Sequence, residues 1–384
     1  MIWSKLNLIE VADVFNGMTP SKVEQRNQGY PVLKIKDVSD DRKFRGVFES
    51  FVDIDLANKF KSKLIKLNDT LILNAAHNAD YVGSKQYRAE SKVVNALPTG
   101  EWLIVRADSN KIDSVYLNFW LRLDETRFKI RNLVKGIHLY PKDVARLKIP
   151  LPPLPEQQKI ASILDAADSL RQKDQQLIEK YNALSQSLFL EMFGDPETNP
   201  MGWTKSIAEK FIDLLTGFAF KSTDYSINKD DINLCGGLII TPTGIEWNKS
   251  NYWRRDKCDG LEKYKIIESD IVMAMDRPWI SSGFKIHKIT KNDKESLLVQ
   301  RTARIRGRGI NQDFLYFLFK HKAFEKQAHT TETTVPHISP KDIRKYELII
   351  PPITLQNQFA ERIQYIEAQK TVSPSQPGKI RSLI

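Results

Sequence analysis

Two series of mainly hydrophobic positions recur every seven residues along the stretch from residue 154 to residue 193. The series are Ile160, Ala167, Asp174, Tyr181 and Leu188, and Ile163, Leu170, Leu177, Leu184 and Glu191. A heptad pattern of this length predicts one long helix with a coiled-coil seam. Pro155 suits the first turn of that helix, and Gly194 followed by Asp195-Pro196 ends it. The polar Asp174 weakens such a seam but can fix its register.

On both sides of this helix, short apolar runs are separated by Gly, Asn, Asp and Pro, which is typical of α+β domains. The predicted strands are 32–35, 70–73 and 102–105, then 237–241, 270–274 and 297–305. Helical stretches are predicted at 114–127 and 311–327, with loops at 135–140 and 333–339. A second, shorter helix is predicted from residue 353 to about 370, because Phe359, Ile363 and Ile366 give it an apolar face. The proline-containing tail 371–384 cannot extend that helix.

The chain repeats itself. The segment GIHLYPKDVARLKIPLPPLPEQQKIA (Gly136–Ala161) aligns without a gap on VPHISPKDIRKYELIIPPITLQNQFA (Val335–Ala360), at an offset of 199 residues. Near the start of each copy, Trp3 matches Trp203 and Gly17 matches Gly217 at an offset of 200. Self-similarity over so long a period indicates two copies of one unit, each a domain followed by a helix.

The charge is distributed in blocks. Residues 1–150 contain 25 Lys and Arg against 18 Asp and Glu, a net charge of +7, and residues 201–350 contain 25 against 19, a net charge of +6. Residues 151–200 contain 4 against 8, a net charge of −4. Two basic blocks separated by an acidic helix favour a polyanionic partner such as nucleic acid. The alternative is that the basic pI serves only solubility.

Other features of the composition limit the class of protein. The chain has no apolar stretch long enough to span a membrane, and its start lacks the apolar core of a signal peptide. The two cysteines, Cys235 and Cys258, make a disulfide framework or a zinc site improbable, so we expect a cytoplasmic protein.

The repeated basic domain, the Pro-Pro…Gln…Ala element and the long helix together resemble the specificity (S) subunit of type I restriction–modification systems. The resemblance covers the chain to about Lys370. It implies two target recognition domains, each reading one half of a bipartite DNA site, and antiparallel helices that act as a spacer with pseudo-twofold symmetry. It also implies that the subunit is not catalytic. Its partners would be double-stranded DNA, two adenine-methyltransferase (M) subunits and restriction (R) subunits.

We therefore expect an α+β protein with two tandem recognition domains separated by long antiparallel coiled-coil helices. The expected boundaries are 1–153 for the first recognition domain, 154–193 for the spacer helix, 194–352 for the second domain, 353–370 for the shortened second helix and 371–384 for the tail. The family usually has a second helix comparable to the first. The shorter one here leaves part of the seam (Leu177, Tyr181, Leu184 and Leu188) predicted to seek a helix from an M subunit or from a second copy of the chain.

Basic residues interleaved with aromatic and amide side chains are the candidates for DNA contact. In the first half they are Lys34, Lys36, Arg42, Lys43, Arg45, Asn74, His77, Asn78, Lys85, Tyr87, Arg88, Lys135 and His138. In the second half they are Thr241, Thr243, Asn248, Lys249, Tyr252, Arg254, Arg255, Arg277, Trp279, Ser281, Ser282 and His337. For any single one of them a solvated surface role is an equal alternative, and His138 and His337 can equally be hydrogen-bonded residues of a turn.

A self-sufficient methyltransferase or nuclease, and a scaffold that does not bind nucleic acid, are the alternatives. Asp276-Arg277-Pro278-Trp279 resembles a methyltransferase loop, but no glycine-rich strand–turn–helix precedes it to hold a methyl donor. Asp80 with Glu90-Ser91-Lys92 resembles a nuclease pattern that arises readily by chance in a chain with 27% charged residues. The histidines lack metal-ligand spacing and there is no Walker A sequence, so we expect neither a metal nor a cofactor.

Overall fold

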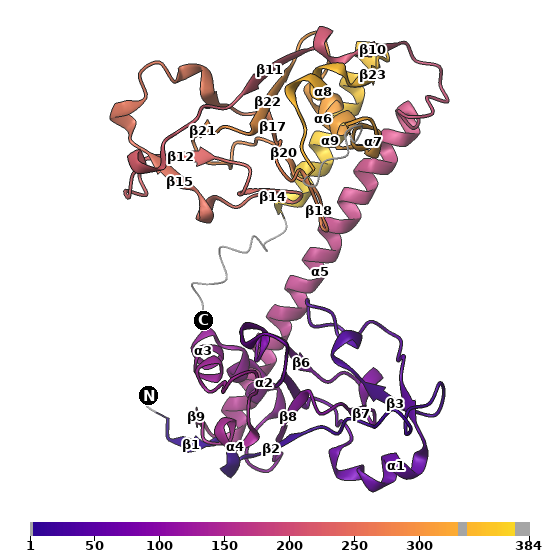
Figure 1. Ribbon diagram of the computed structural model, residues 1–384, viewed down its shortest axis with the longest axis vertical. Coiled ribbons are helices and arrows are strands. Elements are labelled where there is room, and N and C mark those ends of the chain that lie inside the picture. The colour runs from indigo at the N-terminus through magenta and orange to yellow at the C-terminus, as the bar shows by residue number, and fades with distance from the viewer. Residues whose placement is uncertain (1–2, 329–335, 373–384) are drawn as a thin grey trace. The chain divides into compact units, whose positions relative to one another are not determined.

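The computed structural model of the protein describes residues 3–328 and 336–372. Its contacts divide the chain into two units, Met1–Gln172 and Lys173–Ile384, which are coloured from indigo to magenta and from magenta to yellow in Figure 1. The long helix α5 (Leu154–Phe193) begins in the first unit and ends in the second. Each unit is described by itself below.

The first unit is built on a four-stranded antiparallel sheet with the strand order β2-β8-β5-β6. A smaller sheet has the order β4-β3-β7, with β3 parallel to β7, and β1 pairs with β9. The strands are β1 (Lys5–Asn7), β2 (Ala12–Asn16), β3 (Tyr30–Leu33), β4 (Phe51–Val52), β5 (Thr70–Leu73), β6 (Gln86–Arg88), β7 (Leu97–Pro98), β8 (Trp102–Ala107) and β9 (Lys148–Pro150). The α-helices that precede α5 are α1 (Ile54–Lys59), α2 (Ser114–Arg122), α3 (Asp124–Asn132) and α4 (Pro141–Val144).

The second unit repeats this arrangement. Its main sheet has the order β11-β22-β17-β20, its smaller sheet has the order β15-β12-β21-β16 with β12 parallel to β21, and β10 pairs with β23. The strands are β10 (Lys205–Ile207), β11 (Ile212–Thr216), β12 (Ile232–Cys235), β15 (Asn251–Trp253), β16 (Lys265–Ile266), β17 (Ile271–Ala274), β20 (Ile286–Lys288), β21 (Ser296–Leu298), β22 (Thr302–Gly307) and β23 (Glu347–Ile349). The helices after α5 are α6 (Gln312–Lys320), α7 (Lys322–Ala328), α8 (Pro340–Lys345) and α9 (Ile353–Val372).

Two short hairpins are particular to the second unit. One is formed by β13 (Ile240–Thr241) and β14 (Gly244–Ile245), and the other by β18 (Trp279–Ile280) and β19 (Gly283–Phe284). They touch, since a Cβ on Gly283 would lie 3.4 Å from the Cβ of Pro242. The β18–β19 hairpin occupies a stretch where the first unit has a 3-10 helix and a turn, and the β13–β14 hairpin occupies one where the first unit has a single bridge between Val38 and Phe44.

The residues matched by the sequence repeat occupy the same places in the two units. Gly17 and Gly217 each lie against a carbonyl, and an added Cβ would approach the oxygens of Thr99 and Val299 to 2.2 and 2.0 Å. Only glycine permits so close an approach of two backbone segments. In each unit this contact holds the end of the first sheet strand against the smaller sheet.

The repeated glutamine explains why the Pro-Pro…Gln element recurs. Gln157 accepts a hydrogen bond from the N–H of Asp113 (2.9 Å) and donates one to the carbonyl of Pro152 (2.8 Å). Gln356 makes the same two bonds, from the N–H of Asn311 (2.9 Å) and to the carbonyl of Pro351 (2.8 Å). Both glutamines are 1% exposed. Each side chain therefore ties the start of a long helix to the residue that caps α2 or α6.

The hydrophobic cores lie between each main sheet and its helices. In the first unit, Ile72, Leu103 and Val105 pack with helix residues of α2 and with Ala161 at the start of α5. In the second, the core contains a group of packed aromatic rings, in which Phe189 stacks on Phe314 and Phe317 and meets Phe359 edge-to-face, at centroid distances of 5.7–5.8 Å. The end of α5 and the start of α9 are thereby fixed to the second unit.

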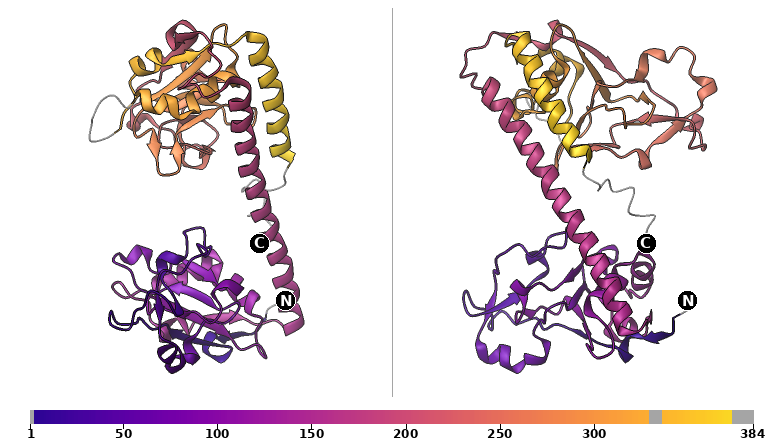
Figure 2. Two further views of the ribbon diagram at one scale, coloured as in Figure 1. Left: turned by 90° about the vertical axis from the view of Figure 1, so that its right-hand side faces the viewer. Right: turned by 180° about the vertical axis from the view of Figure 1, so that it is seen from behind.

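Within the second unit, α9 runs antiparallel to the end of α5 (Figure 2). Lys370, near the end of α9, donates to Asn182 (2.9 Å), whereas Arg362, a little more than two turns earlier, contacts Met192. The prediction that α9 covers only part of the α5 seam is confirmed, because Leu177 and Leu184 are 39% and 51% exposed. The prediction that Tyr181 and Leu188 are uncovered is wrong: both pack against the core of the second unit.

Most of the predicted strands and helices are found, with differences at their ends. The strand predicted at 237–241 is wrong in its first part, because residues 237–239 form a turn and only Ile240–Thr241 is a strand. The helical stretch predicted at 311–327 is two helices, α6 and α7. The helical stretch predicted at 114–127 is two helices, because Leu123 is extended (ψ 139°) between α2 and α3. The strand predicted at 297–305 is the two strands β21 and β22, which are separated by a turn in which Arg301 has a φ of 61°. The loop predicted at 333–339 lies partly outside the described residues, as does the tail. No helix in the described part of the chain is long and apolar enough to cross a membrane.

Candidate nucleic-acid interface

In both units the loop that follows the central strand of the main sheet is joined to a histidine-containing loop. In the first unit, Leu139 N–H donates to the carbonyl of Asn74 (2.7 Å), and Ala75 forms a bridge with His138. In the second, Ile338 N–H donates to the carbonyl of Met275 (2.8 Å), and Asp276 forms a bridge with His337. Segments predicted separately from the sequence, 74–78 with 135–138 and 276–282 with His337, are thus neighbours.

At this edge the second unit has a charged cluster. Asp276 accepts hydrogen bonds from Arg301 (2.6 Å) and from His337 (2.7 Å). Burial would raise the pKa of Asp276, but the bonds from Arg301 and His337 outweigh it and lower that pKa below its ordinary value. The N–H of Arg277 donates to the carbonyl of Pro336 (3.0 Å), and this bond holds Arg277 at a φ of 44° with its side chain exposed.

The first basic loop, from Lys34 to Arg45, is stabilised by its own ion pairs. Lys36 pairs with Glu49, Lys43 with Asp41 (3.4 Å), and Arg45 donates to the carbonyl of Lys36 (2.9 Å). Burial lowers the pKa of Arg42, and the nearby Arg122, Arg127 and Arg171 lower it further. Asp168 opposes this lowering of the Arg42 pKa and pairs with Arg122 (3.7 Å) and Arg171 (3.0 Å), so the positive charge of the cluster is partly neutralised within the first unit.

The structure distributes the other first-unit candidates between surface and interior. His77 and Asn78 are exposed, while Lys85 donates to the carbonyl of Val38 (2.8 Å) and Arg88 pairs with Asp165 of α5 (2.7 Å). Lys135 pairs with Asp143 (2.7 Å), and its hydrogen bond lowers the pKa of that carboxyl.

Asn74 and Tyr87, by contrast, are 4% and 1% exposed. Asn74 donates to Asn16 (2.9 Å) and to the carbonyl of Gly100 (3.0 Å). Burial raises the pKa of Tyr87. A side chain enclosed in this way cannot meet a ligand at the surface, so both residues belong to the scaffold and we leave them out of the proposed interface.

In the second unit, the candidates from residue 241 to residue 255 lie on and after the β13–β14 hairpin. Thr241 donates to the carbonyl of Gly244 (2.8 Å) and lies beside the exposed Thr243. Asn248 is exposed and Tyr252 is half-buried. The three cations of this group are in ion pairs: Lys249 with Glu246, Arg254 with Asp256, and Arg255 with Glu295. Ser281 and Ser282 are exposed in the β18–β19 hairpin, and Trp279 stacks on Phe284 within it (5.1 Å).

The comparisons with known proteins point the same way as this geometry. The family model described as the type I restriction modification DNA specificity domain matches residues 2–180 and 217–375. The chain belongs to this family. Two relatives of this chain come from Methanocaldococcus jannaschii. The type I restriction enzyme MjaVIII specificity subunit is 25% identical in sequence, and the match covers 95% of this chain and 86% of that one. The putative MjaX specificity subunit is 24% identical, covering 95% and 87%.

A solved structure supports the fold of this specificity-domain chain. The type I restriction-modification S subunit from M. genitalium superposes with a TM-score of 0.59 at 13% sequence identity, covering 97% of this chain and 91% of that one. The α+β class, the two tandem domains and the long helix, all expected from the sequence, are therefore confirmed.

The cluster of Asp276, Arg301 and His337 was not predicted as a unit. Only His337 was a candidate, and Asp276 was considered only as part of a methyltransferase-like motif. The sequence signal for Arg301 is the offset of 200, which matches it with Glu101. The structure agrees with this match, because Met275 N–H donates to the carbonyl of Arg301 (2.9 Å) as Asn74 N–H donates to the carbonyl of Glu101 (2.9 Å). A charge reversal at matched positions marks where the two specificity domains have diverged.

The described part of the chain contains no group of three or more His, Cys, Asp and Glu side chains that is placed to hold a metal ion.

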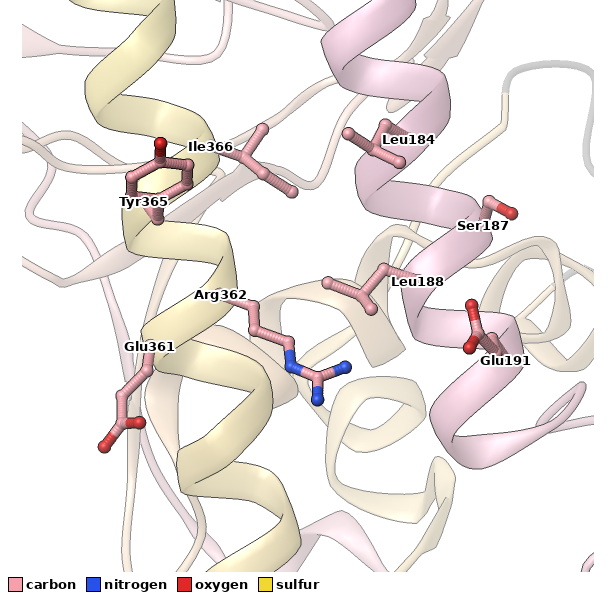
Figure 3. Close-up of a pocket in the computed structure, with 8 residues that line it drawn as sticks. All are labelled: Leu184, Ser187, Leu188, Glu191, Glu361, Arg362, Tyr365 and Ile366. Carbon is pink, nitrogen blue, oxygen red and sulfur yellow. The ribbon is translucent and has the colours of Figure 1, made fainter.

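A groove lies between α5 and α9 in the second unit, with a volume of about 460 Å³ (Figure 3). Leu184, Leu188 and Ile366 point into it, and Arg362 extends from α9 towards α5, where it contacts Met192. Glu191 and Glu361 also line it.

Proposed function

We propose that the chain is the DNA-reading subunit of a type I restriction–modification complex and that each unit reads one half of a bipartite site. The carrying observation is the duplicated unit, in which the same loops meet at the same edge of each sheet but present different side chains. His77 and Asn78 follow the central strand in the first unit, whereas Arg277 and the β18–β19 hairpin follow it in the second. Different side chains at matched positions predict half-sites of different sequence, so the site is not a palindrome.

The recognition domains are proposed as residues 1–153 and 194–352, with the helix 154–193 as the spacer that sets the unread gap. A continuous α-helix becomes longer by about 1.5 Å for each residue that is inserted. Inserting one heptad into α5 therefore changes the gap and leaves both half-sites as they were. Neither domain is proposed to be catalytic: methylation and ATP-dependent cleavage belong to M and R subunits.

The experiment is methylation mapping of DNA from cells that express this chain with its M subunit. The expected result is methylated adenines in a single bipartite sequence, with the two halves separated by a fixed number of unread base pairs. Exchanging the first unit for that of a relative serves as the matched control, since it should change one half-site alone. Methylation without sequence preference, or at a palindrome, would contradict the proposal.

We further propose that the groove between α5 and α9 receives a helix of an M subunit. Leu177 and Leu184 are exposed at heptad spacing beside it, and Tyr365 is 69% exposed. An apolar stripe with charged residues at its margins is the surface that a third helix covers in a bundle. Changing Leu184 to Glu should weaken co-purification of the M subunit, whereas Lys180→Glu, on the exposed part of the same helix, should not. Unchanged assembly in both variants would place the M subunit elsewhere.

A further inference from the structure

The first unit has a polar hollow of about 380 Å³ beside the start of α2. Its wall includes Asn68, Arg106, Ala107, Ser114 and Gln158. It lies at the beginning of β5, whereas the candidate DNA loops follow the end of that strand. The hollow is therefore not part of the proposed DNA interface.

In the second unit a side chain of the protein occupies the matching place. Gln312, the first residue of α6, donates to the carbonyls of Ser269 (2.9 Å) and Ile305 (3.0 Å). Its Oε1 accepts from the N–H of Gly307 (2.7 Å). The carboxamide thus uses both of its N–H groups and its oxygen on backbone groups.

Much of the backbone that surrounds Gln312 is matched in the first unit, except that Ala107 stands where the second unit has Gly307, on which an added Cβ would lie 3.2 Å from the Gln312 amide oxygen. Asp113 caps α2 as Asn311 caps α6, each accepting from the N–H groups two and three residues later. Asn68 and Ser269 have nearly the same positive φ, 64° and 69°.

The strand pairing on the other side of the hollow is matched as well. Val105 pairs with β5 as Ile305 pairs with β17. Ser114 therefore stands at the position of Gln312, and its hydroxyl, one bond from Cβ, is too short to reach the groups that a glutamine amide reaches.

The floor of the hollow favours a neutral polar group over an anion. Four of the five N–H groups of Arg106 are used, on both oxygens of Asp69 (3.0 and 2.7 Å) and on the carbonyls of Ser62 (2.9 Å) and Leu64 (2.6 Å), and its charge is paired with Asp69. An anion entering here would meet no free cation in the floor and would lie near the buried carboxylate of Asp69, which is unfavourable.

We propose that this hollow binds the primary carboxamide of a glutamine side chain that a partner protein presents. The second unit shows which side chain fits, because its own Gln312 makes the three bonds in the equivalent place. The rim of the hollow carries Leu67, which is 58% exposed, and the exposed Lys66. A partner surface with an apolar and an acidic residue beside its glutamine complements this rim. The proposal goes beyond DNA reading and does not depend on it.

The test is saturation-transfer NMR on the full chain with N-acetyl-L-glutamine methylamide as the probe and the matching glutamate derivative as the control. We expect transfer to the side-chain protons of the glutamine probe that is at least about fivefold stronger than to the glutamate control. Ser114→Gln should abolish the difference, because the protein then fills its own hollow. Ser114→Ala, which keeps the hollow open, should retain it.

Two further measurements keep the outcome decisive. Gln312→Ser opens the equivalent place in the second unit, so transfer to the glutamine probe should rise about twofold. Ser114→Gln should also raise the melting temperature by about 2–4 °C, since the new amide satisfies backbone groups. Equal transfer to both probes, a signal that survives Ser114→Gln, or no rise with Gln312→Ser would overturn the proposal.

Discussion

The two units share the hydrogen bonds of their interior, whereas the side chains of their surface loops differ. The glutamine that anchors each long helix makes the same two bonds in both units. The Arg106–Asp69 pair of the first unit recurs as Arg306–Asp270, with bonds of 2.5 and 2.9 Å. At the other end of the central strand the backbone bonds are kept but the side chains are not: Glu101 stands where Arg301 stands, and Ala75 where Asp276 stands.

This contrast shows that the duplicated scaffold and the surface loops are under different physical constraints. A buried group that loses its partner costs the full desolvation of that group, so the bonds of the interior change only together. An exposed loop side chain is solvated whichever residue occupies the position. The loops are therefore free to diverge, and they have diverged at the edge where we place the DNA.

The largest expected effect on stability comes from the glycine of each unit that lies directly against a backbone carbonyl. Gly217→Ala places a Cβ about 2.0 Å from the carbonyl oxygen of Val299, so one of the two backbone segments must move. We expect a loss of about 3–5 kcal/mol in the free energy of unfolding of the second unit, and Gly17→Ala should do the same in the first. Differential scanning calorimetry measures both. Gly236→Ala is the control, because its Cβ would meet only ordinary contacts at 3.8 Å. Equal behaviour of Gly236→Ala and Gly217→Ala would contradict the assigned close approach.

The next effect concerns the helix anchors. Gln157→Ala and Gln356→Ala each leave a buried N–H and a buried carbonyl without a partner, at a cost of about 2–3 kcal/mol in the unfolding free energy. The two losses should be similar, because the bonds match in length to 0.1 Å. Chemical denaturation of the full chain provides the measurement, with the exposed Gln158→Ala as the control. A large effect at only one of the two sites would break the equivalence of the units.

The sequence was sufficient for the architecture because the interior constraints leave regular traces. A heptad spacing predicted α5, and the offset of about 200 residues predicted the repeated unit, including the glycine and glutamine that the structure shows in matched contacts. The ends of elements were less accessible. The break at Leu123 depends on an extended ψ that no residue type at that position dictates.

The exposed face of α5 shows where the sequence could mislead. A heptad series predicts which residues share a face but not which face is covered. Tyr181 and Leu188 of one series pack against the core of the second unit, while Leu170, Leu177 and Leu184 of the other series are 39–53% exposed. The interface residues could be predicted only as clusters, because burial decides whether a polar residue such as Asn74 supports the loop or belongs to its surface.

A smaller and pH-dependent effect distinguishes the second unit from the first. Asp293 accepts bonds from His287 (3.1 Å), Trp247 (3.0 Å) and the N–H of Thr290 (2.8 Å), which tie the β13–β14 region to the end of β20. Burial would raise the pKa of Asp293, but these hydrogen bonds and the charge of His287 lower it well below the ordinary value of 3.8. A carboxyl with a lowered pKa stabilises the fold above its unfolded pKa, and that contribution is lost as the pH falls.

We therefore expect Asp293→Asn to reduce the unfolding free energy at pH 7 by about 1–2 kcal/mol, and the difference to shrink progressively as the pH falls below the ordinary pKa of 3.8. Urea denaturation from pH 7 to about pH 2 measures the difference between the variant and the unchanged chain. Asp259→Asn serves as the control, because that carboxyl is exposed. A difference that grew as the pH fell would contradict the assigned direction of the pKa change.

The smallest expected effect addresses the loops directly. His77→Ala and Arg277→Ala remove exposed side chains that follow the central strands of the first and second units. If each unit reads its own half-site, each variant should weaken binding of the assembled complex by about fivefold, a loss of about 1 kcal/mol. The decisive comparison uses duplexes in which one half-site at a time is mutated. Arg277→Ala should lose its effect when the half-site of the second unit is already destroyed, and His77→Ala should lose its effect on the other duplex. A contact that reads one half-site has no effect on binding once that half-site is destroyed. If both variants weaken binding to both duplexes equally, the two side chains contact phosphates without reading bases. The loops would then position the complex on DNA and would not specify its sequence.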